Sequence, residues 1–236
     1  MTDLRALWDF DDPAGSEQRL RAAAEVAEGR DRLVLLTQVV RALGLQERYD
    51  EGHALLDDLA TGDDEVATRV SLERGRLLRS AGEPEQAGPH FDAAEQTAAR
   101  AGLDALRVDA LHMQALVADP GDRLAINERA LELAARSDDQ QARDWDASIL
   151  NNIGMVHADA GDFGAALAPF EQALAARERI GGAGEIRVAR WMVAWALRNL
   201  GRTTEALAMQ RSLKAELDAA GQVDPYVDEE LRLLED

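Results

Sequence analysis

Glycines recur along the chain at a spacing of about 40 residues, and this spacing limits the folds that the chain can adopt. Gly82, Gly161 and Gly201 each lie in a short link between two amphipathic runs. Gly161 and Gly201 are 40 residues apart, and Gly82 and Gly161 are 79 residues apart, close to twice that distance. A period of this length is typical of helical-repeat proteins, in which each repeat is a helix pair that packs against its neighbours.

Apolar residues follow a helical period between these links, and the residues at the links favour helix starts. Asp119 and Asp224 each precede a proline, which joins a capping carboxylate to a residue suited to the first helical turn. Pro89 and Pro169 fall inside expected second helices and should bend them. We expect helix pairs at 31–44 with 46–60, 64–81 with 84–101, 103–118 with 120–136, 138–160 with 162–180, and 184–200 with 202–220, and further helices near 3–9, 13–28 and 225–235.

In the fourth pair, large and small residues follow a set order at Leu150, Ile153, Gly154, His157, Ala166, Phe170 and Ala173. This order resembles that of the tetratricopeptide repeat, a family of antiparallel helix pairs. The match recurs in the second pair at Gly75, Gly82, Ala87, Phe91 and Ala94, and in the fifth at Val193, Ala194, Leu197 and Ala206. Arg74 and Arg190 depart from the pattern, and the long spacing resembles the kinesin-light-chain-like and bacterial peptide-sensor branches.

The resemblance implies an all-α fold, a right-handed superhelical solenoid of antiparallel helix pairs. We expect five repeats over residues 31–220, N-terminal capping helices over 1–30 and a C-terminal capping helix over 221–236. Small residues such as Gly154 would let paired helices approach closely.

Composition excludes several classes of function. The formal charge is -19, from 45 acidic and 26 basic side chains, which argues against nucleic-acid binding. No cysteine is present, so disulfides, thiolate catalysis and the usual structural zinc sites are excluded. Neither a secretory signal nor an apolar run of the ~18 to 20 residues that span a membrane occurs. We therefore expect a cytoplasmic protein, and the many Ala residues and the single Lys214 suggest a bacterial source.

In repeats of this family, the first helices form the concave wall, and the resemblance implies that polar residues there face a groove. The candidate groove residues are Gln38, Arg41, Glu73, Arg76, His112, Asn151, Asn152, Trp191 and Arg198. Asparagine is unfavourable in helix interiors, yet its amide can both donate a hydrogen bond to a peptide backbone and accept one from it. The alternative is that Asn151 and Asn152 bridge repeats or face water. Trp195 is expected to be buried, and His112 to make a structural hydrogen bond rather than to bind a metal.

No catalytic motif is evident. The "GGAG" stretch at 181–184 lacks the strand, Lys and Ser/Thr of a phosphate-binding loop, and the four histidines lie in different repeats, so no metal site or cofactor is expected. We predict a non-catalytic adaptor whose groove binds a protein or peptide. Arg41, Arg76, Arg79 and Arg198 favour an acidic segment or a C-terminal carboxylate. The alternatives are a ligand- or peptide-sensing regulator that acts through a separate effector, and a self-associating structural protein that forms a homodimer.

Removal of a groove residue should affect binding more than folding. We expect Arg76→Ala and Asn151→Ala to change stability by less than ~1 kcal/mol, since wall-facing polar residues are not part of the core.

Overall fold

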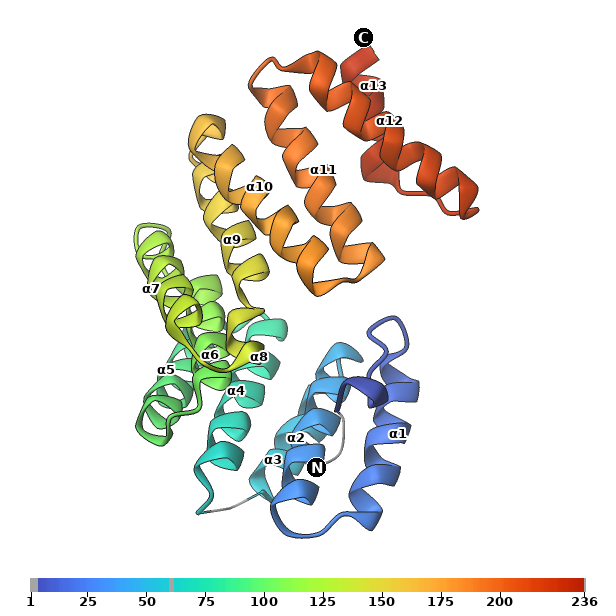
Figure 1. Ribbon diagram of the computed structural model, residues 1–236. Coiled ribbons are helices and arrows are strands. Elements are labelled where there is room, and N and C mark those ends of the chain that lie inside the picture. Colours follow the sequence, from blue (N-terminus) through green and yellow to red (C-terminus); the bar gives the residue numbers. More distant parts are fainter. Residues whose placement is uncertain (1–3, 60–61, 236) are drawn as a thin grey trace. The chain divides into compact units, whose positions relative to one another are not determined.

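A computed structural model describes residues 4–59 and 62–235, and 82% of this part of the chain is helical (Figure 1). The N-terminal helices are η1 (Leu4–Leu7), α1 (Pro13–Val26), α2 (Gly29–Leu45), α3 (Tyr49–Asp57), α4 (Asp64–Ser80), α5 (Pro84–Ala101) and α6 (Asp104–Val117). They are followed by α7 (Arg123–Arg136), α8 (Gln140–Arg143), α9 (Asp146–Asp159), α10 (Phe163–Ile180), α11 (Ala183–Asn199), α12 (Thr203–Ala219) and α13 (Pro225–Glu235). No strand occurs within the described ranges.

The repeated glycines lie where one helix turns into the next. Gly82, Gly161 and Gly201 have φ of +86°, +77° and +74°, a left-handed conformation that glycine adopts without steric cost. The helix that follows Gly161 is capped by Asp162, whose carboxylate accepts from the amide of Ala165 at 2.9 Å. The 40-residue spacing in the sequence therefore reflects the loops between paired helices.

Most helices lie within three residues of the predicted ranges, and three differences have local causes. The helix predicted over 138–160 is divided into α8 and α9, because Asp139 caps α8 and a turn follows at 144–145. The helix predicted from 120 begins at Arg123, because a turn at 119–122 comes first. The helix predicted over 46–60 begins at Tyr49, since Glu47 has a φ of +60°. Residues 3 and 60, at the ends of two predicted helices, lie outside the described residues.

The two prolines that were expected to bend second helices lie inside long helices. Pro89 is in α5 and Pro169 is in α10, and each of these helices has 18 residues. The N–H that proline lacks therefore does not end either helix.

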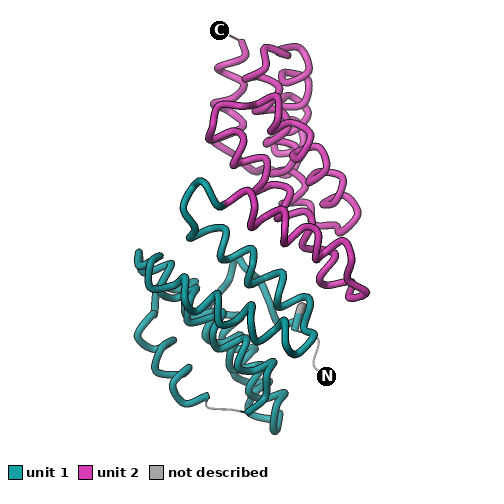
Figure 2. Tube along the Cα trace, turned by 90° about the vertical axis from the view of Figure 1, so that its left-hand side faces the viewer, with its two compact units in different colours: residues 1–122 teal, residues 123–236 magenta. Residues whose placement is uncertain are grey.

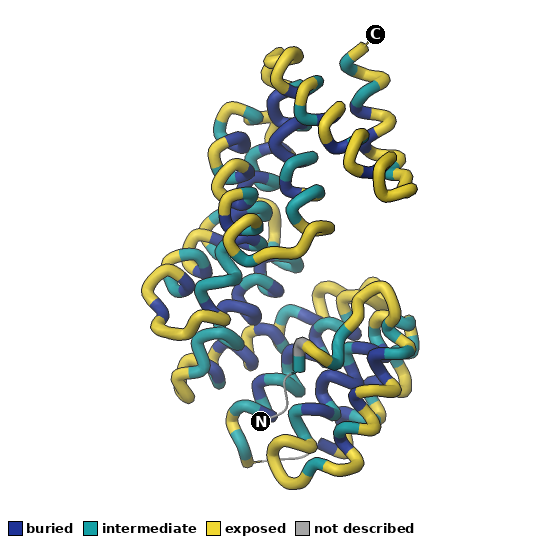
Figure 3. The backbone as a smooth tube through the Cα atoms, turned by 45° about the vertical axis from the view of Figure 1, so that its right-hand side comes forward, coloured by how far each residue is buried: buried dark blue, intermediate teal, exposed yellow. Residues whose placement is uncertain are grey.

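The chain divides into two compact units, which we call unit 1 (residues 1–122) and unit 2 (residues 123–236) (Figure 2). In unit 1, α1 packs on α2, α4 packs on α2 and α5, and α6 packs on α4 and α5. In unit 2, α9 packs on α7 and α10, α11 packs on α10 and α12, and α13 packs on α12. Within each unit, Figure 3 shows the buried positions where helices face each other and the exposed positions at the links.

Two glycine–phenylalanine contacts fix the closest helix approaches. A Cβ atom on Gly75 would lie 2.4 Å from Cε1 of Phe91, and one on Gly154 would lie 2.4 Å from Cε1 of Phe170. Both phenylalanines are fully buried. A side chain larger than hydrogen does not fit at either glycine unless the helices move. No helix in the described part of the chain is both long and apolar enough to cross a lipid bilayer.

Candidate functional site

The predicted groove residues fall into both units, and each group is described by itself. Unit 1 contains Gln38, Arg41, Glu73, Arg76 and His112, and unit 2 contains Asn151, Asn152, Trp191 and Arg198.

In unit 1 the first helices of successive pairs, α2, α4 and α6, lie side by side and join their charged side chains. Arg76 on α4 donates to Glu73, one turn earlier, and to Asp109 on α6, both at 2.5 Å. The Arg76 side chain is only 13% exposed, and Glu73 and Asp109 are less so. These contacts correct the expectation that Arg76 stands apart from the core: it holds two buried carboxylates and joins α4 to α6.

Electrostatics within this cluster keep Arg76 and Asp109 ionised. Burial alone would lower the pKa of Arg76, but the charges of Asp109 and Glu73 outweigh it, and the pKa is raised above its ordinary value. Burial would likewise raise the pKa of Asp109, yet the positive charges of Arg76 and Arg41 lower it. The pairing between helices is therefore ionic at neutral pH.

Arg41 on α2 differs from Arg76 because no carboxylate in the described part of the chain is paired with its guanidinium. It is half-buried and, among the described residues, forms no ion pair and no hydrogen bond. Its pKa is lowered, first by the nearby charge of Arg76 and then by burial, while Glu73 and Asp109 act in the opposite direction. The protein thus places a guanidinium where the local charge favours an added anion.

A cavity of about 200 Å³ opens beside Arg41. Glu73, Arg76 and Arg79 also line it, together with Leu45, Leu77 and Met113. Arg79 is exposed and, within the described part of the chain, makes no ion pair. The second carboxylate oxygen of Glu73, Oε2, is buried without a hydrogen-bond partner. The cavity therefore presents two guanidinium groups with spare donors and one carboxylate oxygen with spare acceptor capacity.

Gln38 and His112 lie next to this cluster. Gln38 is buried on α2, and its Oε1 accepts a hydrogen bond of 3.1 Å from Nε1 of Trp8. Burial lowers the pKa of His112 to about 4; Asp109 opposes the shift, whereas Arg76 and Arg79 add to it. His112 is therefore neutral at neutral pH. No group of three or more potential metal ligands occurs in the residues that the structure describes.

In unit 2, α9 presents two neutral amides. Asn151 and Asn152 are both half-buried, and Asn151 makes no side-chain hydrogen bond in the described part of the chain. Arg198, near the end of α11, is held by both carboxylate oxygens of Glu230 on α13, at 2.8 and 2.9 Å. This pairing fastens the last helix and occupies the guanidinium.

Trp191, one of the predicted groove residues, lies among other aromatic side chains. Trp191 stacks on Trp195 with ring centroids 6.0 Å apart, and Trp195 meets Phe163 edge-on at 5.0 Å. Trp195 is half-buried against the core rather than fully buried as expected. Trp191 also lines an apolar cavity of about 260 Å³ with Tyr226 and Val188, and its Nε1 is buried without a partner.

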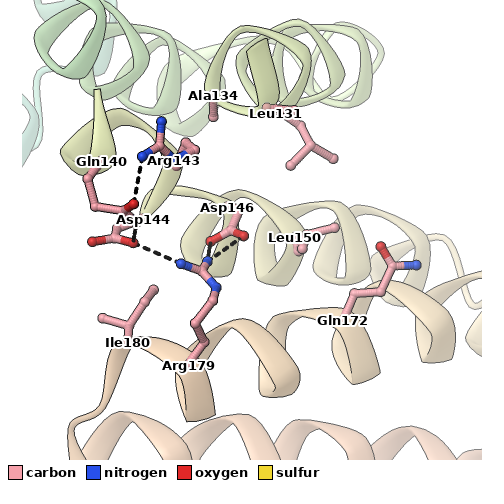
Figure 4. A pocket seen from close by; sticks show the side chains of 11 residues that line it. Leu131, Ala134, Gln140, Arg143, Asp144, Asp146, Leu150, Gln172, Arg179 and Ile180 are labelled. Atoms are coloured by element: carbon pink, nitrogen blue, oxygen red, sulfur yellow. Dashed lines mark hydrogen bonds and ion pairs between the residues drawn. The ribbon is translucent and has the colours of Figure 1, made fainter. Parts of the chain in front are cut away.

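A larger hollow, of about 730 Å³, lies between α7, α9 and α10 (Figure 4). Leu131, Leu150 and Gln172, one from each of these helices, line it. At one end the guanidinium of Arg179 is held by Asp144 and Asp146 at 2.7–2.9 Å. These three charged groups satisfy one another, and Arg143, which also lines the hollow, donates to the carbonyl of Ser137 and to the side chain of Gln140.

Two residues near the unit 1 cluster, Trp8 and Phe10, are not among the candidates that the sequence indicates. Trp8 contacts Gln38, and the ring of Phe10 lies over the guanidinium of Arg41, with Cζ 5.9 Å from the ring centroid. Their signal was a pair of aromatics in the acidic stretch "LWDFDD", in a chain with few aromatics. Periodicity assigned this stretch only to a capping helix.

One part of the chain matches a known family in sequence, and the whole chain resembles solved proteins in fold. A model of the family described as tetratricopeptide repeat matches residues 145–213. A search of curated proteins finds no match. The fold is similar to that of BtubC (BKLC) from P. vanneervenii, with a TM-score of 0.67, 16% identity and 95% of each chain covered.

Two further solved structures have a similar fold. The apo form of the quorum sensor NprR from B. thuringiensis has a TM-score of 0.65 and 15% identity, over 96% of this chain and 64% of that one. A signal-transduction ATPase with a tetratricopeptide repeat sensor from Pyrococcus horikoshii has a TM-score of 0.71 and 10% identity, over 98% of this chain and 35% of that one. Residues 145–213 therefore match the tetratricopeptide repeat in sequence, and the chain as a whole has an all-helical fold similar to that of solved proteins with such repeats.

Proposed function

We propose that this chain is a non-catalytic binding module that holds an extended peptide on the first helices of unit 1. The partner would present a carboxylate, from an acidic residue or from its C-terminus, to Arg41 and Arg79. The observation that carries the proposal is the half-buried Arg41, which has no ion pair among the described residues and lines a cavity with Arg79. A carboxylate there would gain charge-assisted hydrogen bonds.

Glu73 adds a second requirement on the ligand. Its Oε2 is buried and unpaired, so a group that brings an N–H donor as well as a carboxylate would satisfy both sides of the cavity. A peptide provides both groups, because each residue carries a backbone N–H. One similar structure is NprR in complex with its cognate peptide NprX, with a TM-score of 0.57 and 15% identity, which supports a peptide as the class of ligand.

The roles of the other predicted residues follow from their partners. Arg76 organises the site by holding Glu73 and Asp109, rather than by meeting the ligand itself. Asn151, with its amide unused within the described residues, is the candidate in unit 2 for a contact with peptide backbone. Arg198 is engaged by Glu230 and is the weakest of the predicted contacts.

A binding assay tests the role of Arg41. Fluorescent acidic peptides with a free C-terminus are titrated with the wild-type protein, Arg41→Ala and the matched control Arg32→Ala, which removes an exposed guanidinium from the same helix. Arg41→Ala should weaken binding about tenfold or more, since a hydrogen bond to a charged group contributes ~1.5–3 kcal/mol. Added salt should weaken the wild-type complex. Equal affinity in wild type and Arg41→Ala would place the binding surface elsewhere.

A further inference from the structure

The N-terminal segment, residues 4–12, lies on the same helix face as the proposed peptide site. The Trp8 indole donates to Gln38 on α2, and Trp8 and Phe10 stack with centroids 4.9 Å apart and planes 9° from parallel. Phe10 in turn covers the guanidinium of Arg41. The residue that the proposed function assigns to an incoming carboxylate is therefore covered by an aromatic ring of the chain itself.

Hydrogen bonds anchor the segment before Phe10, at Leu7 and Asp9, and after it, where Asp12 caps α1. The backbone N–H of Asp9 donates to Ser16 Oγ at 2.9 Å, and that hydroxyl donates to the Asp9 carbonyl at 2.8 Å. Arg19 donates to the carbonyl of Leu7 at 3.1 Å. Phe10 itself is 61% exposed. Its ring can leave Arg41 while the anchors at Leu7 and Asp9 stay in place.

The contact of the Phe10 ring with Arg41 is weaker than the contact that a ligand carboxylate would make with Arg41. An exposed ring over a guanidinium is held by a modest cation–π attraction, whereas a carboxylate would form charge-assisted hydrogen bonds. Two of the segment's three carboxylates are used locally, since Asp12 accepts from the amide of Gly15 and Asp9 accepts from that of Asp11. In the described part of the chain, none of the three forms an ion pair with Arg41. The chain thus provides the ring but no carboxylate for Arg41.

We propose that residues 8–12, "WDFDD", occupy the peptide site as an internal substitute for its ligand, and that the ligand is an acidic peptide containing an aromatic residue. This inference depends on the proposed function. The ligand's ring replaces that of Phe10, and its carboxylate reaches Arg41. Phe10 therefore competes with the ligand and lowers its apparent affinity.

Two synthetic peptides test this competition in the full chain. The probe is a labelled peptide of residues 6–12, "ALWDFDD", and its matched control is "ALADADD", which keeps the charges and lacks both rings. Phe10→Ala should bind the probe about two- to fivefold more tightly than wild type does, the equivalent of one exposed cation–π contact. Arg41→Ala in the Phe10→Ala background should abolish the gain. Val26→Ala, which removes another exposed apolar side chain of unit 1, should leave affinity unchanged.

The outcomes separate this inference from the proposed function. If wild type and Phe10→Ala bind the probe with equal affinity, the proposal that Phe10 competes with the ligand is wrong. If Phe10→Ala binds the two peptides with equal affinity, the ligand does not need an aromatic residue. In both cases a loss of binding in Arg41→Ala would leave the proposed carboxylate site intact. Binding that does not depend on Arg41 in any background would overturn both proposals.

Discussion

The helix pair α4–α5 of unit 1 and the pair α9–α10 of unit 2 use the same packing and different polar chemistry. Gly75 meets Phe91 in one pair, and Gly154 meets Phe170 in the other, with the corresponding residues 79 apart in both cases. Each contact would place a Cβ atom 2.4 Å from the ring. The positions where the helices touch are therefore repeated.

Side chains next to these glycines are not repeated. At the same offset of 79 residues, Glu73 corresponds to Asn152 and Arg76 corresponds to Met155. Unit 1 thus has a buried ionic cluster where unit 2 has an amide and a thioether. The contrast teaches that the helix pair repeats its packing residues, including Ala87 with Ala166 and Ala94 with Ala173, while the polar positions beside them differ.

The largest effect is expected from making α4 resemble α9 at a single position. Arg76→Met leaves Glu73 and Asp109 buried without their cation, and loss of one partner from a buried pair costs ~3–5 kcal/mol. Urea denaturation monitored by circular dichroism measures the loss. A change below ~1 kcal/mol would mean that the ionic cluster is not coupled to folding, as the sequence analysis assumed.

A triple variant sharpens the same comparison. Glu73→Asn, Arg76→Met and Asp109→Asn together remove all three charges, so no carboxylate is left uncompensated. Buried ionic groups can often be replaced by neutral ones at little cost, and the triple variant should recover most of the stability lost in Arg76→Met. If it is less stable than the single variant, the charges themselves hold α4 and α6 together.

A second test concerns the packing that the two pairs share. Gly154→Leu and Gly75→Leu should each destabilise the protein by ~1–3 kcal/mol, because each added side chain overlaps a buried phenylalanine. Gly88→Leu in α5 and Gly184→Leu in α11 are matched controls, since nothing lies within 4 Å of a Cβ atom at either position. Thermal unfolding of the four variants should separate them into two groups, and similar losses in all four would contradict the shared contact.

The sequence was sufficient to predict the fold because the fold depends on local, repeated signals. Gly161 and Gly201 marked the left-handed turns, and Asp162 marked a helix start. The break between α8 and α9 was not predicted, because the turn at 144–145 does not interrupt the apolar period of residues 138–160. Asp144 in this turn accepts a hydrogen bond from Arg179, 35 residues away, and a local pattern does not contain such a contact.

The candidate site was predictable only in part, because its character depends on which charges meet. Arg41 and Arg76 look equivalent in the sequence, yet Arg76 pairs with Asp109, 33 residues away, and Arg41 pairs with no carboxylate in the described part of the chain. Helix periodicity gives the face on which a side chain lies. It does not give its partner on another helix.

A third prediction uses the neutral His112 of unit 1. Its pKa is lowered from 6.5 to about 4 in the folded protein, so between these values the unfolded chain binds a proton that the folded chain does not. Stability contributed by this group is therefore lost as pH falls through this range. From pH 7 to pH 5.5 the free energy of unfolding should fall by about 1 kcal/mol more in wild type than in His112→Gln. Equal pH dependence in the two proteins would contradict the burial of His112.

The smallest effect is expected at Asn151 of α9, whose counterpart 79 residues earlier is the buried Leu72. Asn151→Ala removes an amide that makes no hydrogen bond within the described residues and replaces it with a better helix former. The variant should be as stable as wild type or more stable by ~0.5 kcal/mol. This result would mean that Asn151 does not stabilise the fold. Such a result is expected of a residue whose amide binds the backbone of a peptide ligand.

A matched asparagine in the same unit calibrates this measurement. Asn127 on α7 is buried, and its amide donates to the carbonyl of Arg123 at 2.8 Å. Asn127→Ala should therefore cost ~1 kcal/mol, since it removes a made hydrogen bond from a buried site. If chemical denaturation gives Asn151→Ala a loss as large as that of Asn127→Ala, Asn151 has a structural hydrogen bond in solution. The interpretation of its amide as a contact for peptide backbone would then be wrong, and recognition by this chain would depend on the charged face of unit 1 alone.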